Sequence, residues 1–166
     1  MNDERSDALG DELRRIEESA THSGQSQFEQ SKFWRGTNLF VGGPAAILAA
    51  VSGATGLAAA SNRTTAAVLA LIAAGLGAVV TTLNAASRAD RAHVSANAYL
   101  AIQTEARQLR LLDLDRLGPD EARDRVGDLT TRLQEINSAA EIPSQFAYRR
   151  GNRNINKGGQ TYGPDA

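Results

Sequence analysis

The feature that most constrains this chain is a long stretch in its middle that is almost free of charge. From Gly36 to Ser87 there are 52 residues, and Arg63 is the only charged one. Since 22% of the whole chain is charged, a soluble protein of this composition would place about eleven charges in such a window. The runs on either side of Arg63, residues 37–62 and 64–87, each exceed the roughly 20 residues that cross about 30 Å of hydrocarbon.

Both runs are rich in alanine and lack a period of two, so they predict helices rather than strands. A bilayer also requires the backbone polar groups of a spanning segment to pair internally, which favours helices. We therefore expect an all-α protein with a two-helix transmembrane hairpin over residues 36–87, its spans at about 39–61 and 66–86. Each span gains only about 2–5 kcal/mol from its bulky apolar residues, so insertion as a pair is expected.

Gly42, Gly43 and Pro44 interrupt the first run and leave open where its helix starts. Proline is tolerated in a first helical turn, where its missing N–H was unpaired anyway. The regular span therefore begins near Pro44, or a kinked helix starts near Trp34.

Small residues recur at four-residue spacing along both predicted spans. Small side chains let helix backbones approach closely, which is how membrane helices gain packing. We expect helix pairing, both within the hairpin and between the subunits of a homo-oligomer, through six of these positions: Ala46, Ala50, Gly53, Ala74, Gly77 and Ala78.

The segments outside the hairpin are polar and are predicted to be mostly helical. Residues 1–35 read as an amphipathic helix, interrupted at 22–27, followed by the segment that enters the membrane. The second span is expected to continue as one long helix as far as Gly118-Pro119, and a further helix ends at Pro143, so that helices occupy residues 88–142. The tail, residues 143–166, has no periodic apolar pattern and is expected to be disordered.

The basic residues at the ends of the hairpin predict its orientation. Lys32 and Arg35 precede the first span and Arg88 and Arg91 follow the second, whereas the connecting turn has Arg63 alone. The positive-inside rule then predicts a multi-pass protein with both termini in the cytoplasm. No cleavable signal peptide is expected, since the N-terminus is acidic and the apolar run begins late.

The sequence contains no pattern typical of an enzyme. There is no Cys and there are only two His residues, His22 and His93, so we expect no thiolate chemistry and no metal site. No glycine-rich phosphate loop is present, so no catalytic residue and no cofactor are predicted. The net charge of −1 gives no basic surface for nucleic acid.

One combination of segments goes beyond a generic hairpin: KFWRG at 32–36, two spans, and RADRAHVSANAYLAIQTEARQL directly after them. Over about residues 28–142 the chain resembles the SLATT family of bacteria, two-transmembrane effector domains associated with SMODS nucleotidyltransferase sensors and ligand-binding SLOG domains. The positions that carry the resemblance are Trp34, His93, Ala96, Tyr99, Leu100, Glu105 and Leu109.

The resemblance implies an effector of the bacterial inner membrane that forms a pore, or otherwise permeabilises the bilayer, in antiviral or inter-bacterial conflict. A nucleotidyltransferase or SLOG-type sensor protein would be its trigger. Two other functions fit the residues as well. One is a non-toxic membrane scaffold or anchor. The other is a soluble Ala-rich helical assembly subunit, whose hairpin would be buried inside an oligomer rather than in lipid.

Overall fold

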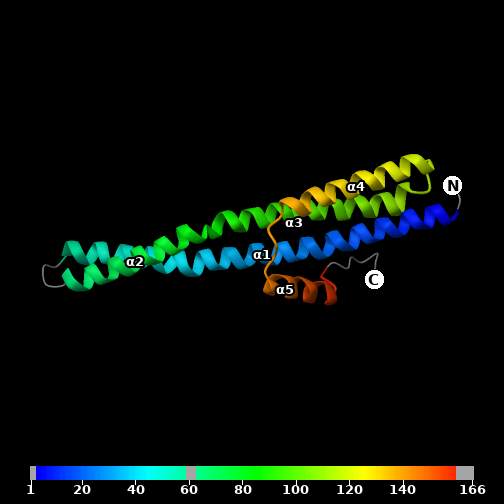
Figure 1. Cartoon of the computed structure of the whole chain (residues 1–166). Coiled ribbons are helices and arrows are strands. Elements are labelled where there is room, and N and C mark those ends of the chain that lie inside the picture. Colours follow the sequence, from blue (N-terminus) through cyan, green and yellow to red (C-terminus); the bar gives the residue numbers. More distant parts are fainter. Residues whose placement is uncertain (1–2, 59–62, 160–166) are drawn as a thin grey trace. The chain divides into compact units, whose positions relative to one another are not determined.

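The computed structural model describes residues 3–58 and 63–159, and within these ranges the chain forms helices and no strand (Figure 1). The predicted all-α class is therefore confirmed. The elements in order are α1 (Asp3–Ala58), α2 (Arg63–Leu83), α3 (Ala85–Gln108), a π-helical turn (Leu109–Asp113), α4 (Pro119–Ala139) and α5 (Gln145–Asn156).

The chain divides into two compact units. The bundle unit contains the chain up to Gln30 and from Arg91 onward, and the hairpin unit is Ser31–Asp90, beside the predicted boundaries at residues 36 and 87. Both α1 and α3 contribute residues to both units, because each helix continues across a boundary.

The hydrophobic core of the bundle unit lies between the first part of α1, α3 and α4. Apolar residues at three- and four-residue spacing face this core, as the sequence pattern predicts. They include Leu13, Ile16, Tyr99, Ile102, Ala106, Val126, Leu129 and Leu133.

The π-helical turn changes which leucine reaches that core. The Leu114 N–H donates to the Leu109 carbonyl, a five-residue spacing that inserts one extra residue into the turn. The extra residue rotates the helix face, so Leu112, which continues the α-helical stripe in the sequence, is 61% exposed, whereas Leu114 is buried.

The start of α4 agrees with the sequence. Gly118 is its N-cap in an extended conformation, Pro119 occupies the first turn, and Asp120 and Glu121 follow, where the helix dipole favours negative charge.

The predicted disorder of residues 143–166 is corrected over Gln145–Asn156, which form α5. The Ser144 hydroxyl caps this helix by accepting from the Ala147 N–H at 3.3 Å. Ala147 and Gly151 are buried, so packing holds α5 in place. Residues 160–166 of the predicted tail lie outside the described residues.

Helix α1 runs through both interruptions that the sequence suggests. At 22–27 no break occurs, and the Ser26 hydroxyl donates to the His22 carbonyl at 2.8 Å within the helix. This segment is buried against the rest of the bundle unit, and such packing overrides weak helix propensity. Pro44 also lies inside α1, so the helix starts at neither Trp34 nor Pro44 but at Asp3.

A single residue separates α2 from α3, where the sequence predicts one continuous helix. Asn84 adopts the left-handed conformation with φ 47°, which asparagine tolerates better than most residues. Its N–H still donates to the Val80 carbonyl at 3.1 Å, and the Arg88 N–H donates to its carbonyl at 3.1 Å. The interruption is therefore local.

Candidate functional site

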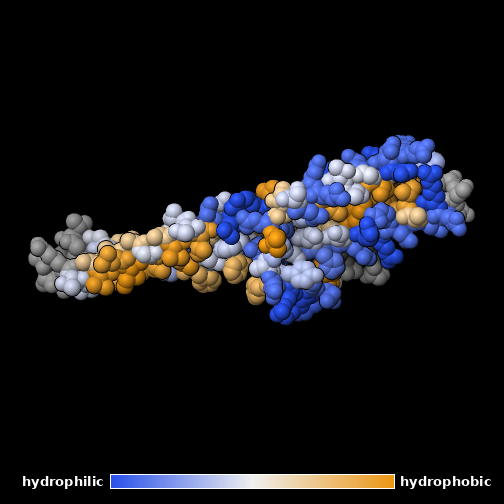
Figure 2. Space-filling view, in the orientation of Figure 1, coloured by the Kyte–Doolittle hydropathy of each residue, from blue (hydrophilic) through white to orange (hydrophobic). Residues whose placement is uncertain are grey.

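The hairpin unit presents an apolar surface on both of its helices (Figure 2). Phe40 on α1 is 80% exposed and Leu71 on α2 is 73% exposed. Other large apolar residues on these helices are also exposed: Leu39, Ile47, Val51, Val68, Ile72 and Val79. A soluble monomer rarely exposes so much contiguous apolar surface, because water does not solvate it favourably.

Two helical stretches, Glu4–Ala54 and Thr64–Asp113, each contain an 18-residue window long and apolar enough to cross a membrane. Only 6% of each window is buried within the chain. The core helix of a soluble protein would be mostly buried, whereas the residues that the structure describes cover little of these windows.

The two helices of the hairpin unit pack against each other through alanines. Ala45 on α1 and Ala66 and Ala73 on α2 are the buried apolar residues of this pair. Their small side chains permit close approach of the backbones, as the four-residue spacing predicts.

The six small residues singled out in the sequence lie elsewhere on these helices. Ala46, Ala50 and Gly53 on α1 are exposed, as are Ala74 and Ala78 on α2, while Gly77 is half-buried. A methyl group added at Gly53 or Gly77 would meet nothing within 4 Å. Within one chain these positions are therefore not the contact between the helices.

An aromatic and basic cluster lies at the end of the hairpin unit near the boundary. The Arg88 guanidinium lies over the Trp34 ring at 5.0 Å from its centroid, and the Phe33 ring meets Trp34 edge-on at 5.3 Å. Trp34 Nε1 is buried without a hydrogen-bond partner. Tryptophan is enriched near the headgroup layer of a membrane, and the contact with Arg88 adds a cation–π attraction.

The other residues that carry the family resemblance lie along α3 and contact its neighbours. His93 meets the Phe28 ring of α1 edge-on, with centroids 5.7 Å apart. Tyr99 is 3% exposed and its hydroxyl donates to Asn137 Oδ1 of α4 at 2.7 Å. Burial raises the pKa of Tyr99 above its ordinary value, so the hydroxyl stays a neutral donor.

Glu105 and Leu100 complete this set without converging on one point. Glu105 accepts from Arg132 of α4 at 2.8 Å, whereas Leu100 is partly exposed. Ala96 and Leu109 are buried in the bundle unit. His93, Tyr99 and Glu105 therefore join α3 to α1 or α4, whereas the exposed Leu100 does not, and these positions form no common pocket.

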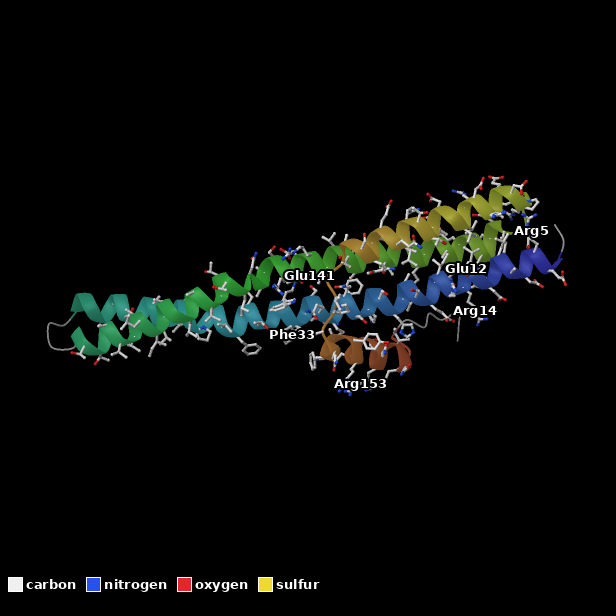
Figure 3. The ribbon with its side chains drawn as sticks, viewed as in Figure 1. Arg5, Glu12, Arg14, Phe33, Glu141 and Arg153 are labelled. Carbon is white, nitrogen blue, oxygen red and sulfur yellow. The ribbon has the colours of Figure 1, made fainter. Side chains whose placement is uncertain are left out.

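Sequence reasoning did not find the buried polar segment of α1. Gln27 Nε2 donates to the Glu141 carbonyl at 2.7 Å, and Gln30 Oε1 accepts from the Ser144 N–H at 3.1 Å and from its hydroxyl at 2.8 Å. These bonds hold the linker between α4 and α5, where Glu141 is labelled in Figure 3. Glutamines are usually expected on the solvent-exposed face of a helix, so nothing in the sequence indicated that these two are buried.

A second polar contact holds α5 itself. Arg150 Nε lies 3.2 Å from the carboxylate of Glu29, which is buried on α1. Across residues 3–58 and 63–159, no group of three or more metal-ligating side chains is close enough to hold an ion.

No protein-family model, curated protein or solved structure matches this chain. The resemblance to the SLATT family therefore remains a prediction from the residues that carry it.

Proposed function

We propose that this chain is a two-span effector of the bacterial inner membrane that assembles as a homo-oligomer and permeabilises the bilayer. The observation that carries the proposal is the apolar surface of the hairpin unit, of whose two windows only 6% is buried within the chain. Lipid covers such a surface without any further protein, and the helices satisfy their own backbone groups.

The distribution of charge and aromatic rings supports both termini in the cytoplasm. Trp34 and Arg88 pair near one end of the hairpin unit. In the sequence, Lys32 and Arg35 lie on either side of Trp34, whereas Arg63 is the one basic residue at the connecting turn. Basic residues are retained on the cytoplasmic side of a membrane, so the bundle unit would lie in the cytoplasm.

The exposed small residues support assembly between copies. Two helices cannot enclose a pore, so permeabilisation requires several hairpins. Ala50 on α1 and Ala74 on α2 are exposed and leave space for the backbone of a neighbouring hairpin. The bundle unit would receive the trigger from a nucleotidyltransferase or SLOG-type sensor protein, as the family resemblance implies.

The test compares two substitutions that create the same residue two positions apart on α2. Ala74→Phe adds bulk where a neighbouring hairpin would approach, whereas Ile72→Phe replaces a residue that is already large and exposed. Each full-length protein is produced in bacteria together with the genes that flank its own. Membrane potential is followed with a voltage-sensitive dye after phage challenge.

We expect the wild-type protein and Ile72→Phe to depolarise the cells, and Ala74→Phe to need about tenfold more protein in the membrane for the same effect, because each lost contact weakens the assembly. Unchanged potential in cells whose membranes hold the wild-type protein would contradict a permeabilising function.

A membrane anchor or scaffold is the second candidate. It is favoured by the bundle unit, whose residues form a hydrophobic core of their own. In that case a stable complex with a cytosolic protein would be recovered from membranes without any change in potential.

A further inference from the structure

Helix α5 carries a row of basic side chains on the face opposite its contact with α1. Ala147 and Gly151 form the buried face of this helix. Residues spaced by three, four, seven and eleven positions share one side of a helix, and five such residues also line one depression in the surface of the bundle unit. We call these five the basic stripe: Phe146, Arg149, Arg150, Arg153 and Lys157.

Most of the positive charge of the basic stripe has no counter-charge. Arg150 pairs with the buried Glu29 at 3.2 Å, and its guanidinium lies over the Phe146 ring, 5.4 Å from the centroid. The other three cations of the stripe are exposed, and among the described residues none forms an ion pair with them. Arg153 points away from α1 (Figure 3). Since residues 143–159 contain no Asp or Glu, this surface attracts an anionic partner.

Exposed apolar side chains lie at the start of the basic stripe. Ile142, in the linker between α4 and α5, is 93% exposed, and Phe146, in the first turn of α5, is 52% exposed. Large apolar residues beside Lys and Arg are typical of helices that lie in the headgroup layer of a membrane. A soluble anion would use only the cations, whereas an anionic lipid surface uses both kinds of side chain.

The connectivity of the chain keeps the start of α5 close to the point where the chain leaves the bundle unit. Gln30, the last residue of that unit before the hairpin, accepts from the Ser144 N–H at 3.1 Å and from its hydroxyl at 2.8 Å. Six positions of α1 lead from Gln30 to Gly36, where the uncharged run begins, and six helical residues span about 9 Å.

Helix α5 then runs back along α1, because Asn152 Oδ1 lies 3.0 Å from His22 Nδ1. The linker and the first turns of α5 are therefore the part of this helix closest along the chain contacts to the hairpin entry. Where the hairpin is inserted in lipid, this short connection holds them within reach of the headgroups.

We propose that the linker and the first turns of α5 bind the membrane surface. Ile142 and Phe146 enter the headgroup layer, and Arg149 and Arg153 pair with the phosphates of anionic lipids. A guanidinium donates two parallel N–H bonds to a phosphate, which suits arginine to this contact. The proposal rests on the membrane location in the proposed function but not on permeabilisation.

The experiment places one fluorescent label at a time in the full-length protein. The chain contains no Cys, so Ile142→Cys, Leu111→Cys and Leu71→Cys each give a single site for the polarity-sensitive dye NBD, and all three residues are exposed. The proteins are reconstituted in nanodiscs of phosphatidylcholine, or of an equal mixture with phosphatidylglycerol. A lipid with a nitroxide on its headgroup quenches any label that contacts the membrane surface.

Leu111 is the control position within the bundle unit. It lies in the π-helical turn, and Leu114 at the end of this turn packs beside Gly10. Twenty helical residues, about 30 Å of α1, separate Gly10 from Gln30. A label at Leu111→Cys therefore reports any quenching that does not come from the surface around α5.

In the mixed nanodiscs we expect strong quenching at Ile142→Cys and none at Leu111→Cys. Arg149→Gln combined with Arg153→Gln should lower the equilibrium constant for contact about 25-fold, because each basic side chain near an anionic surface contributes about fivefold. Arg123→Gln combined with Arg125→Gln removes the same charge from exposed positions of α4 and should leave the quenching unchanged.

Equal quenching at Ile142→Cys in the two lipid compositions would overturn the proposal, and this comparison needs no charge variant. A label that is shielded from water but not quenched would mean that a second copy covers the surface. Loss of quenching in phosphate, but not in chloride of the same ionic strength, would mean that the stripe binds soluble phosphate. Either result would also overturn the proposal.

Nitroxides deep in the acyl chains test the membrane location separately through Leu71→Cys. Quenching at Leu71→Cys without surface quenching at Ile142→Cys would refute the contact of α5 alone. No quenching at Leu71→Cys would refute the insertion of the hairpin, and the contact of α5 with it.

Discussion

At the scale of single residues, the absence of a side chain decides how closely α5 approaches α1. A Cβ added at Gly151 would lie 3.0 Å from the Ser26 backbone nitrogen and 3.1 Å from its Cα. Backbone atoms cannot move aside as the end of a flexible side chain can, so any larger residue separates the two helices. Gly24 has a similar role, since its added Cβ would lie 3.1 Å from Tyr99 Cβ on α3.

Substitution of Gly151 therefore tests whether α5 is held by this contact. We expect Gly151→Leu to destabilise the docked α5 by about 1–3 kcal/mol, because the new side chain meets the α1 backbone. Amide hydrogen exchange should then be at least about tenfold faster in α5 and little changed in α4.

Gly127 in the middle of α4 provides the control, because an added Cβ there meets nothing within 4 Å. Gly127→Ala should raise helix stability by about 0.5–1 kcal/mol. If Gly151→Leu left exchange in α5 unchanged, the close packing of α5 on α1 would be refuted.

At the scale of whole elements, the two helices of the hairpin unit differ from the bundle helices in where their apolar residues point. In the bundle unit a narrow apolar stripe faces the core, and the opposite face carries charges. In the hairpin unit large apolar residues such as Phe40 and Leu71 point away from the paired helix. This reversal is what a lipid environment requires and what water penalises.

An arginine on the outer face of α2 should therefore prevent insertion. We expect Leu71→Arg to cost about 2.5–3.5 kcal/mol of insertion free energy, which exceeds half of what one span gains. The share of protein that resists alkaline carbonate extraction from membranes should fall severalfold.

The matched control is Leu111→Arg, the same change at an exposed leucine of the bundle unit. This variant should remain in the membrane pellet as the wild type does. Equal extraction of Leu71→Arg and the wild type would contradict the placement of α2 in lipid.

At the scale of the whole molecule, two units with different surfaces share one chain. The core of the bundle unit is built entirely from residues before Ser31 and after Asp90. The chain leaves and re-enters this unit at neighbouring points, since Phe28 and His93 rings are 5.7 Å apart. The hairpin is thus an insertion into a domain that has its own core.

Removal of the hairpin tests this independence. We expect a protein in which about six Gly and Ser residues replace Ser31–Asp90 to be soluble, helical and cooperatively folded, because a flexible linker of that length spans more than 10 Å. Circular dichroism and thermal unfolding in plain buffer measure this directly.

Leu129→Ala, at a position 1% exposed, should then lower the free energy of unfolding by about 2–5 kcal/mol, and Leu111→Ala should change it by less than about 0.5 kcal/mol. An aggregated or unfolded deletion protein would show that the bundle unit depends on the hairpin.

The sequence by itself determined the helical class and the hairpin, because the positions of charges and alanines act through solvation and local propensity. The start of α4 at Gly118-Pro119 follows from local backbone chemistry in the same way, whereas its end at Ala139, ahead of the predicted stop at Pro143, does not. Only the tertiary structure decided that α1 continues through 22–27, that α5 forms, and that Leu114 rather than Leu112 is buried.

The candidate sites divide along the same line. The apolar surface of the hairpin could be predicted from the sequence, because each residue contributes its own hydrophobicity independently of the others. The contact of Gln27 and Gln30 on α1 with the linker between α4 and α5 could not, because that linker lies more than a hundred residues later in the chain. The sequence does not show whether a polar side chain hydrogen-bonds to water or to a distant backbone group. Only the packing of the helices decides between these two partners.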